Sequence, residues 1–368
     1  MPTLFDPLHA GDFWLPNRII MAPLTRARAG TTHIPNAVMA EYYAQRATAG
    51  LIITEATMIA ADGCAFTGEA GLFDEACVRG WRAVTDAVHA RGGHIIVQLW
   101  HPGRAAHSDL NGVVPISSTG RAIRKETIRT PRGVKAYEVP RRLAAEEIPS
   151  IVAMFRDAAE RSRLAGFDGV QVHGAHGYLL DQFLRDGVND RTDEYGGTVA
   201  NRARLLLAAV DAASQILGPG RVSVRISPLV GFNDIVDSNP VETVHHVASE
   251  LDRRDIGFLE LRHADHRLEL ERVLARVARE SFRGALFVNG GYNLETAQST
   301  VVNGQADAVV FGQPFISNPD LVARYSIGAP LNSMNPSTLY SVGAEGYTDY
   351  PDYVVGGDLA ANRAAMQH

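Results

Sequence analysis

The hydrophobic residues of the chain fall into short continuous runs, separated by longer stretches in which hydrophobic residues recur at helical spacing. Eight runs contain many β-branched residues, and they lie at 19–23, 51–54, 94–99, 169–174, 222–227, 258–262, 285–290 and 308–312. A short continuous hydrophobic run is typical of a strand that is buried on both faces, as in a parallel sheet. The pattern therefore predicts eight buried parallel strands.

The stretches between these runs predict helices. Three clear examples cover 77–93, 154–166 and 201–218. In the first, Trp81, Val84 and Val88 share one helical face, and the glycine pair at 92–93 ends the helix. Strands that alternate with helices place the helices outside a parallel sheet, and eight such units predict a closed TIM (β/α)8 barrel.

The alternative α/β architecture is an open, doubly wound sheet. Such a sheet usually carries a G-x-G-x-x-G turn after its first strand, whereas residues 22–30 here read APLTRARAG. We therefore favour a single barrel domain over residues 1–368. Two segments interrupt the alternation, and we expect a capping loop region over the barrel mouth at 102–140 and a C-terminal tail at 352–368.

Composition narrows the class of function. The chain is 46% hydrophobic and 21% charged with a net charge of -6, which fits a globular protein and argues against nucleic acid as a partner. Two cysteines, Cys64 and Cys77, indicate no disulfide framework, and neither a signal segment nor a membrane-length apolar run is recognised. We therefore expect a cytoplasmic small-molecule enzyme, a monomer or small homo-oligomer, that binds neither membrane nor nucleic acid.

In a parallel barrel, the residues at the carboxyl ends of the strands face one mouth, where the active site lies. Those residues are Pro23, Leu24, Thr25, Ala56, Gln98, Trp100, His173, His176, Tyr178, Arg225, Asn289, Gly290, Gly291, Gly312 and Gln313. The densest group is His173, His176 and Tyr178, in the segment VHGAHGY after the fourth run. The chemistry of this group decides between the possible reactions.

One interpretation of the two histidines is a metal site. Such a site needs a third ligand and usually a carboxylate base. Glu55 and Glu260 lie on predicted strands, and Asp265 and His266 follow one, so a metal-dependent barrel hydrolase or aldolase stays open. We favour a site without metal because the chain has no H-E-x-x-H motif and no convincing acid at the other strand ends.

The second interpretation is a set of hydrogen-bond donors. Two imidazoles that reach one point can hold a substrate oxygen and stabilise negative charge that develops on it. A tyrosine nearby stays protonated at neutral pH and can deliver a proton to a basic carbanion. No nucleophile or hydride source is present among these side chains, so a cofactor must supply the remaining chemistry.

The other strand ends indicate a phosphorylated planar cofactor. Glycines in VNGGY (288–292) and VVFG (309–312) end the seventh and eighth predicted strands, where barrels often hold a phosphate against backbone N–H groups. Arg225 offers a positive charge to an anionic ring edge, and Gln98 offers both a donor and an acceptor. Together these features suit FMN.

Ordered motifs along nearly the whole chain resemble the old yellow enzyme family of FMN-dependent ene-reductases, in particular the bacterial N-ethylmaleimide reductase-like branch. The motifs are NRIIMAPLTR (17–26), TEAT (54–57), QLWHPGR (98–104), VHGAHGYLLDQFL (172–184), NRARLLL (201–207), VRISP (224–228) and GAEGYTDYP (343–351). The resemblance implies ping-pong reduction of enones, enals, maleimides and nitroalkenes by NADPH or NADH through non-covalent FMN.

The resemblance also implies roles for individual residues. His173 and His176 would bind the activating oxygen of the substrate, and Tyr178 would protonate the alkene carbon after hydride transfer from reduced flavin. Substrate-pocket positions are implied for Phe66, Trp100 and Tyr340, beside the two histidines. Cofactor-binding positions are implied for Pro23, Leu24, Thr25, Ala56, Gln98, Arg225, Gly290, Gly291, Gly312 and Gln313.

The sequence departs from the family pattern in the residue that follows the last barrel glycine. Gln313, in FGQPF, replaces the arginine that usually grips the flavin phosphate, which removes a charge-assisted contact worth about 1.5–3 kcal/mol. We expect weaker FMN retention unless another cation compensates, with Arg283 and Arg324 as candidates. A flavin-binding protein without useful turnover is therefore a further alternative. Phe66 also stands where many relatives carry tyrosine, and Thr25 separates the chain from the branch with cysteine there.

Overall fold

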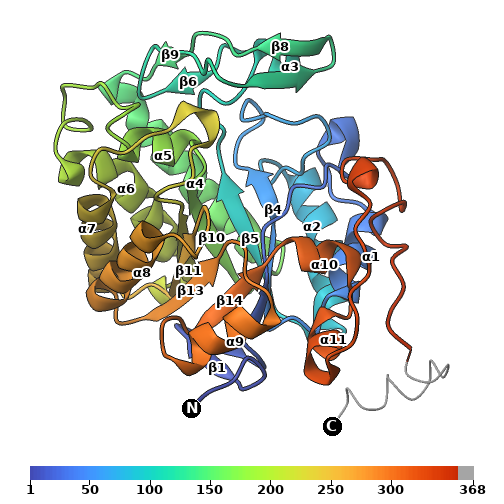
Figure 1. The fold of residues 1–368 in the computed structure, drawn as a ribbon. Coiled ribbons are helices and arrows are strands. Elements are labelled where there is room, and N and C mark those ends of the chain that lie inside the picture. The colour runs from blue at the N-terminus through green and yellow to red at the C-terminus, as the bar shows by residue number, and fades with distance from the viewer. Residues whose placement is uncertain (355–368) are drawn as a thin grey trace.

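The eight predicted strands close into one parallel barrel, which confirms the predicted fold class (Figure 1). The computed structural model describes residues 1–354. The barrel strands are β3 (Ile19–Met21), β4 (Leu51–Met58), β5 (Ile95–Trp100), β10 (Gly169–Gly174), β11 (Val222–Ile226), β12 (Phe258–Arg262), β13 (Ala285–Asn289) and β14 (Ala308–Phe311). Each pairs in parallel with the next, and β14 pairs with β3 to close the barrel.

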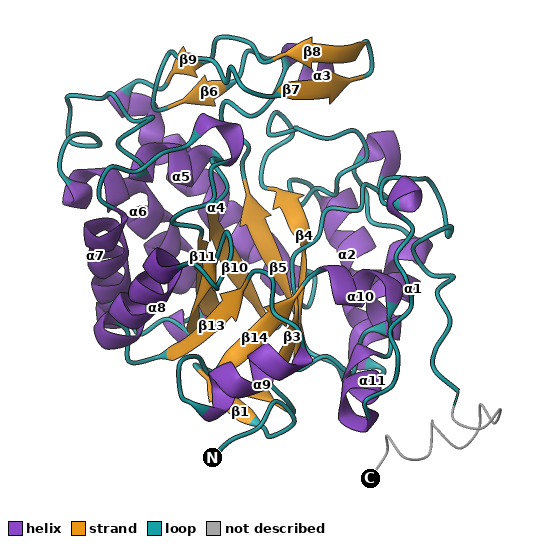
Figure 2. Ribbon diagram, viewed as in Figure 1, coloured by secondary structure: helices purple, strands orange, loops and turns teal. Residues whose placement is uncertain are grey.

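Helices surround the strands on the outside (Figure 2). Those that follow the strands in the chain are α1 (Ala37–Gln45), α2 (Glu75–His89), α4 (Ile148–Leu164), α5 (Leu179–Leu184), α6 (Val199–Leu217), α7 (Pro240–Arg253), α8 (Glu269–Ser281), α9 (Leu294–Val302), α10 (Gln313–Ser317) and α11 (Leu321–Ile327). The face that Trp81, Val84 and Val88 share on α2 is fully buried, as its helical spacing predicts. The main hydrophobic core therefore lies between the strands and the ring of helices.

Two element boundaries differ from the sequence pattern. Strand β4 continues to Met58 because an irregularity between Ile53 and Ala56 shifts its pairing with β5, so the polar TEAT segment stays in the sheet. Ala56 therefore lies within the strand rather than after it. Helix α4 begins at Ile148, with a proline in its first turn, earlier than the apolar spacing alone indicates.

An antiparallel hairpin closes the amino-terminal end of the barrel. It consists of β1 (Leu8–Ala10) and β2 (Phe13–Leu15), and its buried side chains pack against the apolar base of the barrel interior. Phe13 contacts Phe258 edge-on at 6.3 Å between ring centroids, and Phe258 stacks on Phe287 at 4.2 Å. This apolar plug leaves the carboxyl end as the open end of the barrel.

Short elements lie over the carboxyl end of the barrel, at the top of Figure 1. They are α3 (Ser108–Asn111), β6 (Ile116–Ser117), β7 (Thr127–Thr130), β8 (Gly133–Ala136) and β9 (Arg141–Arg142). The segment expected as a loop at 102–140 thus contains the antiparallel hairpin of β7 and β8. Of the tail expected at 352–368, residues 355–368 lie outside the described range. No helix within residues 1–354 is long and apolar enough to cross a membrane.

Candidate active site

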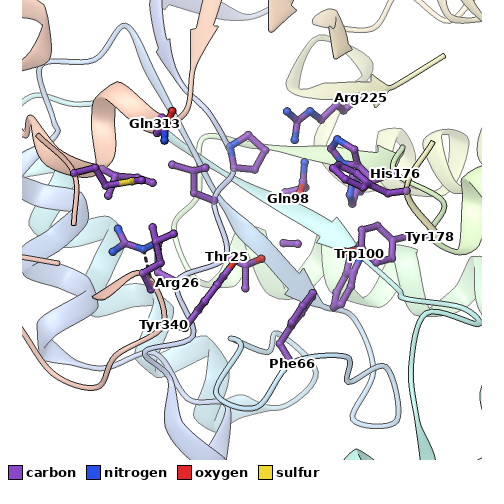
Figure 3. A pocket seen from close by; sticks show the side chains of 18 residues that line it. Thr25, Arg26, Phe66, Gln98, Trp100, His176, Tyr178, Arg225, Gln313 and Tyr340 are labelled. Atoms are coloured by element: carbon purple, nitrogen blue, oxygen red, sulfur yellow. Dashed lines mark hydrogen bonds between the residues drawn. The ribbon is translucent and has the colours of Figure 1, made fainter. Parts of the chain in front are cut away.

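A cavity of about 420 Å³ opens at the carboxyl ends of the barrel strands (Figure 3). Its lining residues are Pro23, Leu24, Thr25, Arg26, Ala56, Phe66, Gln98, Trp100, His173, His176, Tyr178, Arg225, Phe232, Gln313, Ile316, Met334, Leu339 and Tyr340. All three expected catalytic residues and all the expected substrate positions are among them. Of the expected cofactor positions, Gly290, Gly291 and Gly312 do not line the cavity.

Sequence reasoning missed five residues of this lining, namely Arg26, Phe232, Ile316, Met334 and Leu339. Arg26 follows Thr25 directly after the first barrel strand, so its position in the sequence could have predicted that it lines the cavity. The others lie on a loop, on the short helix α10, or on the segment after α11, where no periodicity marks an inward side chain. Only the assembled barrel brings them to the mouth.

Two histidines and a tyrosine converge on one wall of the cavity. The rings of His173 and His176 lie 5.5 Å apart and nearly edge-to-face, and the ring of Tyr178 lies 5.4 Å from that of His173. Trp100 packs edge-on against Tyr178 at 5.0 Å, which holds the phenol in place. His176 and Tyr178 lie on the opposite side of the cavity from Gln313 and Arg26 in Figure 3.

The backbone after β10 is shaped to present His176. Its φ of 58° is left-handed, a conformation that costs free energy for a residue with a side chain. Two hydrogen bonds hold it there, because its N–H donates to Ser227 Oγ at 2.8 Å and its carbonyl accepts from Asn233 Nδ2 at 2.8 Å. The next residue must be glycine, since a Cβ on Gly177 would lie 2.6 Å from the carbonyl oxygen of Phe232.

The three side chains are held in their neutral forms. Burial, and then the positive charge of Arg225, lower the pKa of both His173 and His176 well below the usual value. Burial raises the pKa of Tyr178 well above its usual value. Each imidazole therefore offers one N–H donor, and the phenol keeps its proton at neutral pH.

A buried hydrogen-bond relay lies beneath the cavity, above the apolar plug. Gln98 Nε2 donates to Gln171 Oε1 at 2.7 Å, and Gln171 Nε2 donates to Glu260 Oε2 at 2.9 Å. Glu260 also pairs with Arg225 Nε at 2.9 Å. Because a carboxylate only accepts, it fixes the orientation of both amides, and the carbonyl oxygen of Gln98 is left for a bound molecule.

The donor set of the cavity fits a flavin. The pyrimidine edge of a flavin presents carbonyl oxygens and an N–H group, which match the guanidinium of Arg225 and the two-sided amide of Gln98. The Thr25 side chain lines the same cavity and has no hydrogen-bond partner in the described part of the chain. Thr25, Gln98 and Arg225 face a shared space in Figure 3, so their polar groups are placed for one planar ligand.

Two glycines after β13 have backbone conformations that suit a phosphate. Gly290 and Gly291 follow β13 with φ angles of 122° and 79°. A Cβ on Gly290 would lie 2.4 Å from the carbonyl oxygen of His263, so no larger residue fits there. Loops after the seventh and eighth strands of such barrels are where phosphate groups are commonly bound.

The two cations considered as substitutes at Gln313 are engaged elsewhere. Arg283 pairs with Asp252 at 2.9 Å on an exposed surface, and Arg324 pairs with Asp320 at 2.7 Å. Neither lines the cavity. Both guanidiniums are therefore engaged by carboxylates of the protein, and the expectation that one of them compensates for Gln313 stays a prediction.

The geometry also bears on the metal interpretation. Among the described residues, no group of three or more His, Cys, Asp or Glu side chains is arranged to hold a metal ion. Glu260, one of the two strand acids considered as a ligand, is engaged by Arg225 and Gln171. The arrangement of His173 and His176 therefore suits hydrogen bonding to a substrate.

Aromatic side chains form the rim of the cavity, and hydrogen bonds from buried Arg26 hold one segment of it in place. Phe66 stacks on Trp100 at 6.3 Å, and Tyr340 stands 66% exposed at the opposite edge. Arg26 donates to the carbonyl oxygens of Leu339 at 3.1 Å and Gly346 at 2.6 Å, which fixes the segment that carries Tyr340. The entrance thus presents aromatic side chains to an entering molecule.

Comparisons with known proteins show the family of the chain. Residues 3–332 match the NADH:flavin oxidoreductase / NADH oxidase family. The chain is 44% identical, over 95% of its length and 97% of the relative, to a probable flavin mononucleotide-dependent alkene reductase of Leishmania infantum. It is 42% identical to 12-oxophytodienoate reductase 7 of Oryza sativa subsp. japonica, over 95% of this chain and 94% of the relative.

Solved structures give the same result. Morphinone reductase in complex with tetrahydroNAD superposes with a TM-score of 0.93 at 42% identity, covering 97% of this chain and 99% of that one. The old yellow enzyme homologue of Zymomonas mobilis superposes with a TM-score of 0.92 at 43% identity, covering 95% and 99%. The chain therefore belongs to the NADH:flavin oxidoreductase / NADH oxidase family, that is, to the FMN-dependent oxidoreductases of the old yellow enzyme type.

Proposed function

We propose that the protein reduces activated C=C bonds of enones, enals, maleimides and nitroalkenes, with NADPH or NADH as the reductant. The observation that carries this proposal is the group of three neutral donors, His173, His176 and Tyr178, on one wall of a cavity whose floor fits a flavin. The alkene reductase of Leishmania infantum and morphinone reductase support the same chemistry.

The two imidazoles bind the electron-withdrawing oxygen of the substrate. Both are neutral, so each donates one hydrogen bond, and the oxygen becomes negatively charged as the double bond accepts a hydride. The two neutral N–H groups stabilise the negative charge that develops on the substrate oxygen during hydride transfer. A fixed donor of this kind is commonly worth about 10²- to 10³-fold in rate.

Tyr178 supplies the proton that completes the reduction. Its raised pKa keeps it protonated, and its ring lies 5.4 Å from that of His173, so it would protonate the alkene carbon that does not receive the hydride. When bound, FMN supplies the hydride. Thr25, Gln98 and Arg225 would hold the isoalloxazine ring, while Phe66, Trp100 and Tyr340 would position the substrate against it.

The nicotinamide donor and the alkene would use the same cavity in turn. Both would approach the flavin through the same cavity of about 420 Å³, so the oxidised donor would leave before the alkene enters. Two separate half-reactions, a ping-pong scheme, follow from this shared space.

The experiment that tests the proposal is the visible spectrum of the purified protein. Flavin absorption near about 370 and 460 nm should bleach when NADPH is added without oxygen and return when N-ethylmaleimide is added. A His173→Ala/His176→Ala variant should bleach but recover much more slowly with the maleimide. A wild-type protein that stays colourless even with added FMN would contradict the proposal.

A further inference from the structure

Arg262 is a cation at the barrel mouth that has no role in the site described so far. It is the last residue of β12, on the same strand face as Phe258 and Glu260, which both point into the barrel. Its register partner on β13 is Asn289, next to Gly290. The guanidinium therefore belongs to the interior of the barrel at its carboxyl end.

No carboxylate within residues 1–354 forms an ion pair with this guanidinium. In the described part of the chain the side chain forms neither a hydrogen bond nor an ion pair, and Nη1 is buried without a partner. A buried charged donor left unpaired is costly, and arginine remains charged at any ordinary pH. Burial, and then the positive charge of Arg225, lower the pKa of Arg262. The site is therefore short of one negative charge.

The nearest acids are engaged by other groups. Glu260 pairs with Arg225 and accepts from Gln171. Glu271 accepts from the backbone N–H of Ala264 and contacts His263 Nδ1 at 2.8 Å. Both carboxylates act on Arg262 electrostatically, but neither forms an ion pair with it, so its guanidinium is available to a bound anion.

The position of the guanidinium selects the kind of anion. Nη1 lies 3.0 Å from the point where a Cβ on Gly290 would stand, beside the backbone of buried Gly290 and exposed Gly291. His266 Nδ1 contacts the carbonyl oxygen of Gly290 at 3.0 Å, which occupies the acceptor side of that peptide. Bare backbone with positive φ next to a guanidinium suits a phosphate monoester, whose oxygens accept from both.

We propose that Arg262 binds the phosphate group of FMN and thereby supplies the positive charge that Gln313 lacks. The inference rests on the proposed use of FMN and adds the residue that anchors its phosphate. It places the cation on β12, two strands away from β14, after which Gln313 begins α10. Gln313 lines the cavity but contributes no charge.

The test compares FMN with riboflavin, which carries the same ring without the phosphate. Full-length protein freed of flavin is titrated with each, and quenching of flavin fluorescence gives the dissociation constant. Arg262→Met should weaken FMN binding by about 10- to 100-fold and change riboflavin binding by less than about 2-fold. Arg283→Met, which removes an exposed arginine paired with Asp252, is the matched control and should change neither.

The outcomes separate this inference from the proposed function. If wild-type protein binds FMN and Arg262→Met leaves the FMN constant unchanged, or weakens riboflavin equally, the inference is overturned while the function stands. If wild-type protein binds neither flavin, the function itself fails. Should Arg262→Met not fold, Arg262→Lys replaces it, because an ammonium keeps the charge but loses the two-pronged contact. If Arg262→Lys weakens FMN binding, by less than expected for Arg262→Met, and leaves riboflavin binding unchanged, the inference is supported. If the ratio of the FMN and riboflavin dissociation constants stays at its wild-type value, the inference is overturned.

Discussion

Replacing Tyr178 by phenylalanine removes one hydroxyl and leaves the rest of the wall intact. The ring keeps its edge-on contact with Trp100 at 5.0 Å and its contact with His173 at 5.4 Å. The hydroxyl forms no hydrogen bond with the described residues, so its loss leaves no buried partner unsatisfied. We therefore expect the free energy of unfolding to change by less than about 0.5 kcal/mol.

The effect on catalysis should be far larger. A positioned general acid commonly contributes about 10²- to 10⁴-fold, which corresponds to about 3–5 kcal/mol of activation free energy. Only the step that protonates carbon should lose this amount. Reduction of the bound flavin by NADPH needs no proton from Tyr178 and should change by less than about 3-fold.

Anaerobic stopped-flow absorbance separates the two half-reactions. Tyr178→Phe should re-oxidise slowly with 2-cyclohexenone and at the wild-type rate with ferricyanide, which accepts electrons without protonation of a carbon. Equal slowing with both acceptors would mean that the substitution disturbs the flavin site. A wild-type rate with the enone would show that another group delivers the proton.

Three further predictions follow from charge and packing. Because the pKa values of His173 and His176 are lowered and that of Tyr178 is raised, kcat/KM for an enone should be flat between about pH 6.5 and 8.5, and a titration with a midpoint near 6.5 would contradict neutral imidazoles. Burial raises the pKa of Glu69 from 4.5 to about 8. Between these two pH values the folded protein keeps a proton that the unfolded chain releases, so the free energy of unfolding should fall as the pH rises from about 4.5 to about 8. Glu69→Gln keeps the acceptor for the N–H groups of Ala65 and Phe66 and should flatten that fall in melting temperature, whereas an unchanged slope would place its origin elsewhere. Phe13→Ala empties the apolar plug and should cost about 3–5 kcal/mol in urea unfolding with little change in FMN affinity, whereas a cost below about 1 kcal/mol would show that the hairpin is not needed.

The barrel was predictable because strands buried on both faces leave a continuous apolar signature. The parts that were missed lack such a signature. Strand β4 extends through the polar TEAT segment because a local irregularity keeps it paired with β5, and a polar segment gives no strand pattern. The β7–β8 hairpin lies over the mouth, and only Ile128 and Thr130 among its strand residues are buried, so its apolar pattern is too short to predict a hairpin.

The sequence predicts those residues of the candidate site that lie at the carboxyl ends of the barrel strands. His173, Gln98 and Arg225 meet because the carboxyl ends of parallel strands share one mouth. Met334 and Leu339 reach the same cavity from an irregular segment that carries no periodic signal. Likewise, sequence alone gave no reason to distinguish Arg262 from other arginines, since an ion pair or its absence is a property of the folded neighbourhood.

The most direct measurement is the product of the reaction. Purified protein is incubated with NADPH and N-ethylmaleimide without oxygen, and mass spectrometry quantifies N-ethylsuccinimide against the NADPH consumed. We expect one succinimide for each NADPH oxidised, with the yield strongly reduced in His173→Ala/His176→Ala protein at matched flavin content. Consumption of NADPH without any succinimide would contradict reduction of activated alkenes at this site.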